Sequence, residues 1–315
     1  ETVEGSIPGA RATMEALGVP HEHLASPAAL EARWPMRCRG GDQGLFERSA
    51  GQVHASRACG AMAALAAGAG AEVREGEGVV DLCVAGDGGV QAVTTEGRLV
   101  RARRVVLAAG AWTNDLLRML GLELDLEVHN VHWAHYRVDP ALAGAFPQWF
   151  CFRKPDAAAR DGGLYYGFPA QGEEPVIKVG VDYTPEDLRT ASMADFRREP
   201  DPQVVANMDR FMQEHWQGVR ERVDVACSPY TMTRDCDFVL DRLPGLPQVT
   251  VFTGGSGRAF KFGPLLGKLL AEVALGLPPS MDLSTFRADR DGVWKAPAEA
   301  EAPAGAREAD ARVAA

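Results

Sequence analysis

The sequence predicts an α/β fold into which an antiparallel β-sheet domain is inserted. A strand-forming run at residues 249–252 leads through a turn with three glycines into an apolar helix expected at about 264–275. A second apolar run, residues 105–109, has the uninterrupted pattern of a strand that is buried on both faces. Between these two parts, strand-like segments follow one another without a long helical pattern, which is typical of an antiparallel sheet.

The remaining elements can be assigned in chain order from periodicity and from capping and turn residues. Helices are expected at residues 1–18, 28–33 (capped by Ser26), 56–67 (capped by Ser56), 115–120 (capped by Thr113), 193–198 and 202–214. Strands are expected at residues 72–74, 79–84, 90–94, 104–108, 127–138, 149–152, 164–168 and 176–181, and again between 235 and 253.

Composition restricts the class of protein. A chain of 315 residues with 46% hydrophobic residues can form one large domain or two intertwined ones. Its net charge of -10 argues against nucleic acid as a partner, and no apolar run approaches the ~20 residues that cross a bilayer. The six cysteines form no Cys-x-x-Cys pair, so we expect free thiols and a reducing, cytoplasmic location.

The glycine turn after residue 252 is the strongest sign of a ligand site. Gly254, Gly255 and Gly257 allow the backbone to approach a ligand closely, and the following helix presents N–H groups at its N-terminus. Lys261 adds a positive charge beside them. An ordinary turn before a packing helix is the alternative interpretation.

Several motifs in a common order carry a family resemblance. They are Ala109-Gly-Ala-Trp112, Tyr166-Gly-Phe-Pro169, Lys178, Tyr230-Thr-Met-Thr-Arg-Asp235 and Ser256-Gly-Arg-Ala-Phe-Lys-Phe262. Together they resemble the monomeric sarcosine oxidase family, amine-oxidising flavoenzymes of the DAO superfamily, over roughly residues 1–290. The resemblance implies an FAD-dependent oxidoreductase that oxidises the C–N bond of a secondary amine or N-substituted amino acid and passes electrons to O₂, giving H₂O₂. It also implies a small-molecule substrate and a monomer.

The resemblance assigns roles to individual residues. Lys261 would bind the substrate carboxylate, Lys178 would promote the reaction with O₂, and Tyr166 would line the substrate cavity. Each residue also has a purely structural interpretation. Lys261 could be a surface lysine, Lys178 a lysine on an edge strand, and Tyr166 a buried tyrosine of a strand. The cofactor contacts implied are Val79, Gly110, Ala111, Trp112, Ser228, Tyr230, Gly255, Ser256, Gly257, Arg258, Ala259, Phe260 and Lys261.

Three departures from the family pattern modify these expectations. The family cysteine that bonds to the flavin corresponds to Ser228. Cys227 should point to the opposite face of the strand, unless a one-residue bulge at Pro229 turns it, so we expect non-covalent FAD. A family histidine is replaced by Asp182, which favours a more basic substrate group. A second family histidine is replaced by Arg258, whose guanidinium could stabilise reduced flavin or a further acidic group of the substrate.

The sequence contains no Gly-x-Gly-x-x-Gly fingerprint, so we expect an incomplete Rossmann-like FAD-binding domain. We expect this domain at residues 45–122 and 226–290, a substrate domain at 1–44 and 123–225, and a disordered tail at 296–315. Two alternatives to an oxidase remain. The chain could be a related flavin dehydrogenase with another electron acceptor, or an inactive fragment. No metal is expected, because a strand would place His132 on the face opposite His129 and His135.

Overall fold

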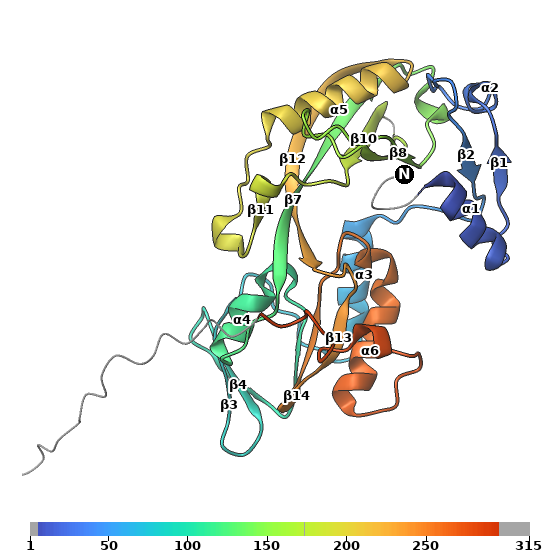
Figure 1. Cartoon of the computed structure of the whole chain (residues 1–315). Coiled ribbons are helices and arrows are strands. Elements are labelled where there is room, and N and C mark those ends of the chain that lie inside the picture. The colour runs from blue at the N-terminus through green and yellow to red at the C-terminus, as the bar shows by residue number, and fades with distance from the viewer. Residues whose placement is uncertain (1–5, 173, 296–315) are drawn as a thin grey trace, which may run out of the picture.

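The computed structural model describes residues 6–172 and 174–295. Figure 1 shows two bodies joined by two long strands, β7 (Leu126–Val138) and β12 (Val219–Thr233), which run from the upper body into the lower one. The two strands pair antiparallel, with Tyr230 opposite His129 and Ala226 opposite Trp133. This shared ladder therefore ties the two bodies together.

The upper body is built on a six-stranded antiparallel sheet. Its strands pair in the order β11-β7-β10-β9-β8, and β12 also pairs with β7, along the whole length of that strand. The other bounds are β8 Trp149–Phe152, β9 Leu164–Phe168, β10 Val176–Val181 and β11 Arg189–Thr190. The strands expected at 149–152, 164–168 and 176–181 are confirmed, and β7 extends the expected strand by one residue.

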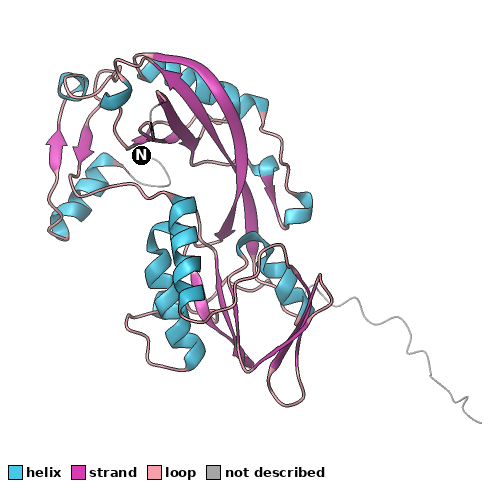
Figure 2. Cartoon of the chain, turned by 180° about the vertical axis from the view of Figure 1, so that it is seen from behind, coloured by secondary structure: helices cyan, strands magenta, loops and turns pink. Residues whose placement is uncertain are grey.

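Helix α5 (Pro202–His215) covers one face of this sheet, as Figure 2 shows from behind. Asp201 caps the helix, accepting hydrogen bonds from the backbone N–H groups of Gln203 and Val204. Buried side chains of the helix, including Met208 and Phe211, pack against sheet residues in the larger core cluster. The opposite face of the sheet remains available for a site.

The lower body contains a short sheet in the order β13-β14-β6. Strand β14 (Leu246–Thr253) is antiparallel to β13 (Val239–Leu243) and parallel to β6 (Val105–Leu107). Helix α6 (Gly263–Leu275) packs on it through Leu266, Leu269 and Val273, close to the expected bounds. The expectation that residues 105–109 are buried on both faces is wrong, because Val106 is 41% exposed at the edge of the described sheet.

Smaller elements complete the described chain. They are α1 Ile7–Ala16, β1 Glu22–Leu24, α2 Pro27–Glu31, β2 Gly44–Phe46, α3 Ala55–Gly68, β3 Val79–Val84, β4 Val90–Thr94, β5 Leu99–Ala102 and α4 Thr113–Met119. The strand expected at 72–74 is absent from the structure, whereas β5 was not expected. Neither Ser56 nor Thr113 is a cap: Ser56 lies inside α3, and the Thr113 hydroxyl donates to the carbonyl of Gly110 at 2.7 Å.

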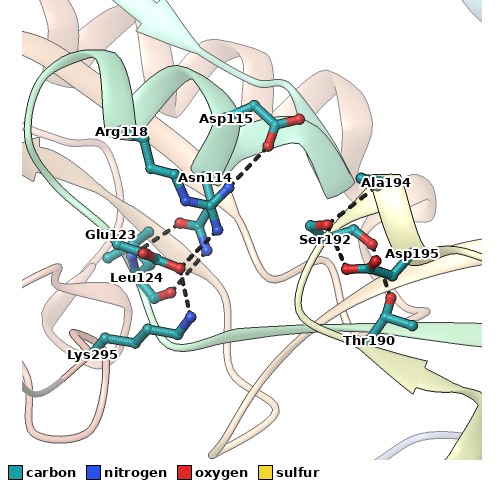
Figure 3. A network of polar contacts seen from close by, with 10 residues as sticks. All are labelled: Asn114, Asp115, Arg118, Glu123, Leu124, Thr190, Ser192, Ala194, Asp195 and Lys295. Carbon is teal, nitrogen blue, oxygen red and sulfur yellow. Dashed lines mark hydrogen bonds and ion pairs between the residues drawn. The ribbon is translucent and has the colours of Figure 1, made fainter. Parts of the chain in front are cut away.

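The end of the described chain is held against α4 by a polar network (Figure 3). The Glu123 carboxylate accepts hydrogen bonds from Arg118 at 2.8 Å and from Lys295 at 2.5 Å. The buried amide of Asn114 exchanges two hydrogen bonds with the backbone of Leu124. The tail expected to be disordered, residues 296–315, lies outside the described residues.

Two general findings concern the whole described region. Within residues 6–172 and 174–295, none of the helices is both long enough and apolar enough to cross a membrane. The six cysteines are free thiols.

Candidate functional site

The candidate residues of the upper body share the sheet face that lies opposite α5. Residues directly opposite each other in an antiparallel pair point to the same side, and alternate residues along one strand do as well. Lys178 on β10 lies opposite Phe168 of β9 and His135 of β7. Tyr166 is two residues from Phe168 along β9, and on β12 Tyr230 lies opposite His129, six residues from His135. The structure therefore brings Tyr166, Lys178, Ser228 and Tyr230 onto one surface.

Two tyrosines meet above a glycine on this surface. The phenol oxygens of Tyr166 and Tyr230 are hydrogen bonded, and burial raises the pKa of both groups. A Cβ built on Gly180 would fall 2.2 Å from Cζ of Tyr166, so the ring can lie across β10 only because Gly180 has no side chain. The result is a polar pair in a largely apolar setting, since Phe150 stacks on Tyr166 with ring centroids 6.4 Å apart.

Lys178 is a half-buried cation on the same face. Its Nζ lies 4.5 Å from the ring centroid of Trp133, within the range of a cation–π contact. Burial lowers the pKa of Lys178, and the carboxylate of Asp224 opposes that shift. The arrangement holds an ammonium group in a partly dehydrated place, where water screens its charge less than at the open surface.

Ser228 and Cys227 point to opposite faces of β12. The Ser228 hydroxyl accepts a hydrogen bond from Nε1 of Trp133 at 3.0 Å, on the candidate face. The thiol of Cys227 donates to the carbonyl of Arg198 at 3.1 Å, behind the sheet, and burial raises its pKa. The opposite orientations are as expected from strand alternation, so Cys227 is turned away from the surface that carries Tyr166 and Lys178.

The second half of the site lies at the carboxyl ends of the parallel strands β6 and β14. The short 3-10 helix η1 (Gly110–Trp112) begins three residues after β6, and the glycine turn follows β14 directly. In open α/β sheets, ligands bind at this edge. Gly257 has a φ of +71°, and a Cβ built on it would fall 2.5 Å from the Tyr230 ring. The glycine turn therefore packs against the end of the tyrosine face.

This edge has the backbone geometry and exposed apolar groups of a ligand-binding surface. Positive backbone φ angles occur at Gly110, Gly254, Ser256 and Gly257, which lets two turns approach a ligand with their main chains. Three large apolar side chains around them stay open to water: Trp112 is 49% exposed, Phe260 45% and Phe262 43%. Exposed apolar groups that cluster at a strand edge indicate a surface that a ligand covers.

Lys261 and Arg258 provide positive charge next to this edge. Both residues are exposed, and Lys261 lies in the 3-10 helix η5 (Ala259–Phe262), directly before α6. The contacts expected at Gly255, Ser256, Ala259 and Phe260 belong to the same turn, which the Ser256 N–H fastens to the Thr231 carbonyl of β12 at 3.0 Å. The turn and its charges therefore have a defined position relative to the tyrosine pair.

A cavity of about 520 Å³ adjoins the tyrosine face. Its lining includes Asp182, His129, Arg189, Tyr230 and Ser256. Burial lowers the pKa of His129, and a contact of its Nε2 with the Glu127 carboxylate opposes that shift. Asp182 therefore brings a carboxylate into a cavity large enough for a small organic molecule.

Val79 is the predicted contact that the structure does not bring to this group. It lies at the start of β3, in the separate sheet β3-β4-β5, and its contact with a cofactor stays a prediction. The three histidines do not converge either, since His132 is fully buried and accepts a hydrogen bond from the Asp201 N–H at 2.8 Å. No group of three or more metal-binding side chains occurs in the described ranges.

Two members of the site were missed by sequence reasoning, Trp133 and Gly180. Trp133 lies in an alternating strand and Gly180 lies between two β-branched residues. Neither pattern indicates a functional residue in the sequence alone. The only available signal for Gly180 was its position two residues after Lys178, where a strand glycine marks close approach by another group. Their roles appear only through the pairing of β7, β9 and β10.

Comparison with known proteins identifies the class to which this fold and site belong. The model of a family described as FAD dependent oxidoreductase (DAO) matches residues 4–273, so the chain belongs to this family. The resemblance inferred from the motifs is thereby confirmed.

Individual relatives agree with this assignment. Peroxisomal sarcosine oxidase of Mus musculus is 32% identical over 288 residues, which cover 89% of this chain and 70% of that protein. N-methyl-L-tryptophan oxidase of Salmonella typhi is 30% identical over 275 residues, covering 83% and 67%. Among solved structures, NikD, an unusual amino acid oxidase essential for nikkomycin biosynthesis, superposes with a TM-score of 0.80 at 28% identity, covering 90% of this chain and 72% of that one.

Proposed function

We propose that this protein oxidises the C–N bond of a secondary amine or an N-substituted amino acid and passes the electrons to O₂, giving H₂O₂. The observation that carries the proposal is the meeting of two surfaces. One is the sheet face with Tyr166, Tyr230 and Lys178; the other is the glycine turn with Lys261 at the carboxyl ends of β6 and β14. The names of the sarcosine and N-methyl-L-tryptophan oxidase relatives support the same chemistry.

FAD, when bound, supplies a two-electron acceptor for the hydride equivalent that leaves the carbon next to nitrogen. The residues that would hold it are those of η1 and the glycine turn, from Gly110 to Trp112 and from Gly255 to Lys261. The positive φ angles at Gly110 and Gly257 support close backbone contact there.

The chain's own side chains bind and orient the substrate. The Lys261 ammonium pairs with the substrate carboxylate by a charge-assisted hydrogen bond. Tyr166 and Tyr230, fixed by their mutual hydrogen bond, limit the space beside the reacting carbon. The Lys178 ammonium stabilises the negative charge that develops on O₂ as it gains its first electron.

Asp182 adds a preference for substrates that carry a further cationic group. Its carboxylate lines the 520 Å³ cavity, and an ammonium placed there would gain a charged partner in a partly buried setting. This preference separates the site from one built around a histidine at the same position.

The finer properties follow from the same residues. We propose that FAD is held non-covalently, since Ser228 has no thiol and Cys227 points behind the sheet. The free cysteines support a reducing compartment such as the cytoplasm, and we propose a monomer. Because the printed sequence has no Gly-x-Gly-x-x-Gly run, we propose that the Rossmann-like unit within residues 45–122 and 226–290 is incomplete and holds FAD weakly by itself.

The test is anaerobic mixing of the protein, saturated with added FAD and checked for bound flavin, with a panel of amines, followed by admission of air. The panel consists of sarcosine, N-methyl-L-tryptophan, Nα-methyl-L-lysine and Nα-methyl-L-norleucine. The last compound matches the lysine derivative but has an uncharged side chain. We expect loss of the visible flavin absorbance with at least one of them, faster with the lysine than with the norleucine derivative, and rapid recovery in air with H₂O₂ formed. Slow recovery would identify a dehydrogenase instead, and an unchanged spectrum with every amine would contradict amine oxidation.

A further inference from the structure

The ammonium of Lys178 rests on an aromatic ring in addition to its long-range interaction with a carboxylate. Gly180, two residues along β10, lies opposite Trp133 of β7, and this register brings the indole beside Lys178. The distance from Nζ to the ring centroid is 4.5 Å. The described neighbours of Lys178 across its two paired strands are Phe168 on β9 and His135 on β7.

The indole itself is held at two places. Its Nε1–H donates to the hydroxyl of Ser228 on β12 at 3.0 Å. The indole also meets the ring of His135 in a T-shaped contact, with centroids 5.4 Å apart and planes at 79°. His135 is fixed in turn by Asp224 of β12, since Nδ1 lies 2.8 Å from the carboxylate oxygen Oδ1.

We infer that Trp133 is a positioning residue for the reaction with O₂: anchored by Ser228, its indole holds the Lys178 ammonium in a charged and accessible state on the candidate face. The inference rests on the proposed role of Lys178. Ser228 occupies the position expected for a flavin-bonded cysteine. The inference gives it a different role on the same surface, which is to anchor the Trp133 indole.

The physical reason lies in how an aromatic ring stabilises a cation. Burial disfavours the charged form of a lysine. A carboxylate in direct contact would restore the charge but also neutralise its field, which would remove the benefit for a developing anion. The quadrupole of an indole stabilises the ammonium without a net negative charge, so the field that acts on O₂ is preserved. Asp224 and His135, the titratable groups facing Lys178 from β12 and β7, are engaged with each other.

The geometry can be tested without FAD. The sequence contains five lysines, so NMR of protein with ¹³Cε-labelled lysine gives a spectrum in which Lys178→Met identifies the Lys178 signal. We expect its Hε resonances to lie upfield of the others, because they sit over the indole. Trp133→Leu should return them to the ordinary position, Trp133→Phe should keep part of the shift, and Ser228→Ala should reduce it. A Lys178 signal that is the same in wild type and in Trp133→Leu would overturn the inference.

The function is tested in the FAD-loaded protein by separating reduction by substrate from reoxidation by O₂. Trp133→Leu should slow reoxidation about tenfold with reduction nearly unchanged, and should move the loss of reoxidation at high pH downward by roughly one unit. Trp133→Phe should recover most of the rate. The matched control is Trp294→Phe, which removes an indole hydrogen bond of 2.7 Å to Ala288 in a different core cluster and should change neither step.

Two outcomes distinguish the role of Lys178 from the role of Trp133. If Lys178→Met reoxidises as fast as wild type, the proposed role of Lys178 is wrong and this inference fails with it. If Lys178→Met is slow while both Trp133 variants keep the wild-type rate and pH profile, only the positioning role of Trp133 is wrong. The NMR spectrum of Trp133→Leu shows whether this variant is folded. If it is misfolded, Trp133→Phe and Ser228→Ala are compared with wild type instead.

Discussion

Tyr166 lies so close to Gly180 that any side chain on the glycine would displace the tyrosine. A Cβ built at position 180 would fall 2.2 Å from Cζ and 2.3 Å from the hydroxyl oxygen of Tyr166. This contact lets the phenol cross β10 and reach Tyr230. A glycine that looks like an interruption in a strand is thus required by the shape of the proposed substrate site.

Gly180→Ala should therefore damage both stability and the site. We expect a loss of about 1–3 kcal/mol in the free energy of unfolding from overpacking, and slower reduction of FAD by substrate because Tyr166 is displaced. Gly267→Ala is the matched control: nothing lies within 4 Å of a Cβ built there, in the interior of α6, so it should stabilise the protein by up to about 1 kcal/mol. Urea unfolding of both variants measures the difference, and equal effects would show that the contact with Tyr166 is unimportant.

The flavin should be released when the protein is denatured with acid. Ser228 cannot form a thioether, and the Cys227 thiol is directed at the Arg198 carbonyl on the other face of β12. After acid precipitation of the FAD-loaded protein, we expect the yellow colour in the supernatant, for wild type and for Cys227→Ala alike. Colour retained in the wild-type pellet and lost from the Cys227→Ala pellet would mean that β12 presents Cys227 to the flavin.

Acid should weaken the attachment of the end of the described chain to α4. Hydrogen bonds from Arg118 and Lys295 lower the pKa of Glu123 to about 2 (Figure 3). A carboxyl whose pKa is lower in the folded state stabilises the protein above its ordinary pKa of about 4.5, and this stabilisation disappears as the pH falls toward 2. The carboxylate is partly exposed, so solvent screening limits the effect to about 1 kcal/mol.

Glu123→Gln should accordingly cost about 1 kcal/mol at pH 6 and almost nothing near pH 2. Denaturant unfolding across this range measures the difference from wild type, with Glu75→Gln, a change at an exposed carboxyl, as the control. A cost that stayed constant with pH would mean that Glu123 acts through packing or neutral hydrogen bonds.

Local patterns predicted the strands that carry the site. The alternation in residues 127–138 and the β-branched run around Lys178 were sufficient to find β7 and β10, and the same alternation separated Ser228 from Cys227. The glycine turn and the helix after it were also found, because capping and turn chemistry are local. The order of motifs then indicated the family.

Long-range pairing accounts for most of what was missed. The first half of β12 contains Arg220, Glu221 and Arg222, whose charges suggest a loop, yet the strand forms because it extends the ladder of β7, with register shifts at that point. The contact between Trp133 and Lys178, 45 positions apart in the sequence, likewise depends on the register of two strands. Val106 was expected to be buried, but whether a second sheet face is covered cannot be read from one strand.

The central claim is that two lysines serve two different steps, and stopped-flow measurement of the two half-reactions tests it most directly. Lys178→Met should slow reoxidation of the reduced protein by O₂ about a hundredfold, equivalent to ~3 kcal/mol, with little change in anaerobic reduction by substrate. Lys261→Met should weaken substrate binding in the reductive half-reaction and leave reoxidation nearly intact. Equal damage to the same half-reaction by both variants, or no change in either step, would contradict the assignment of these residues.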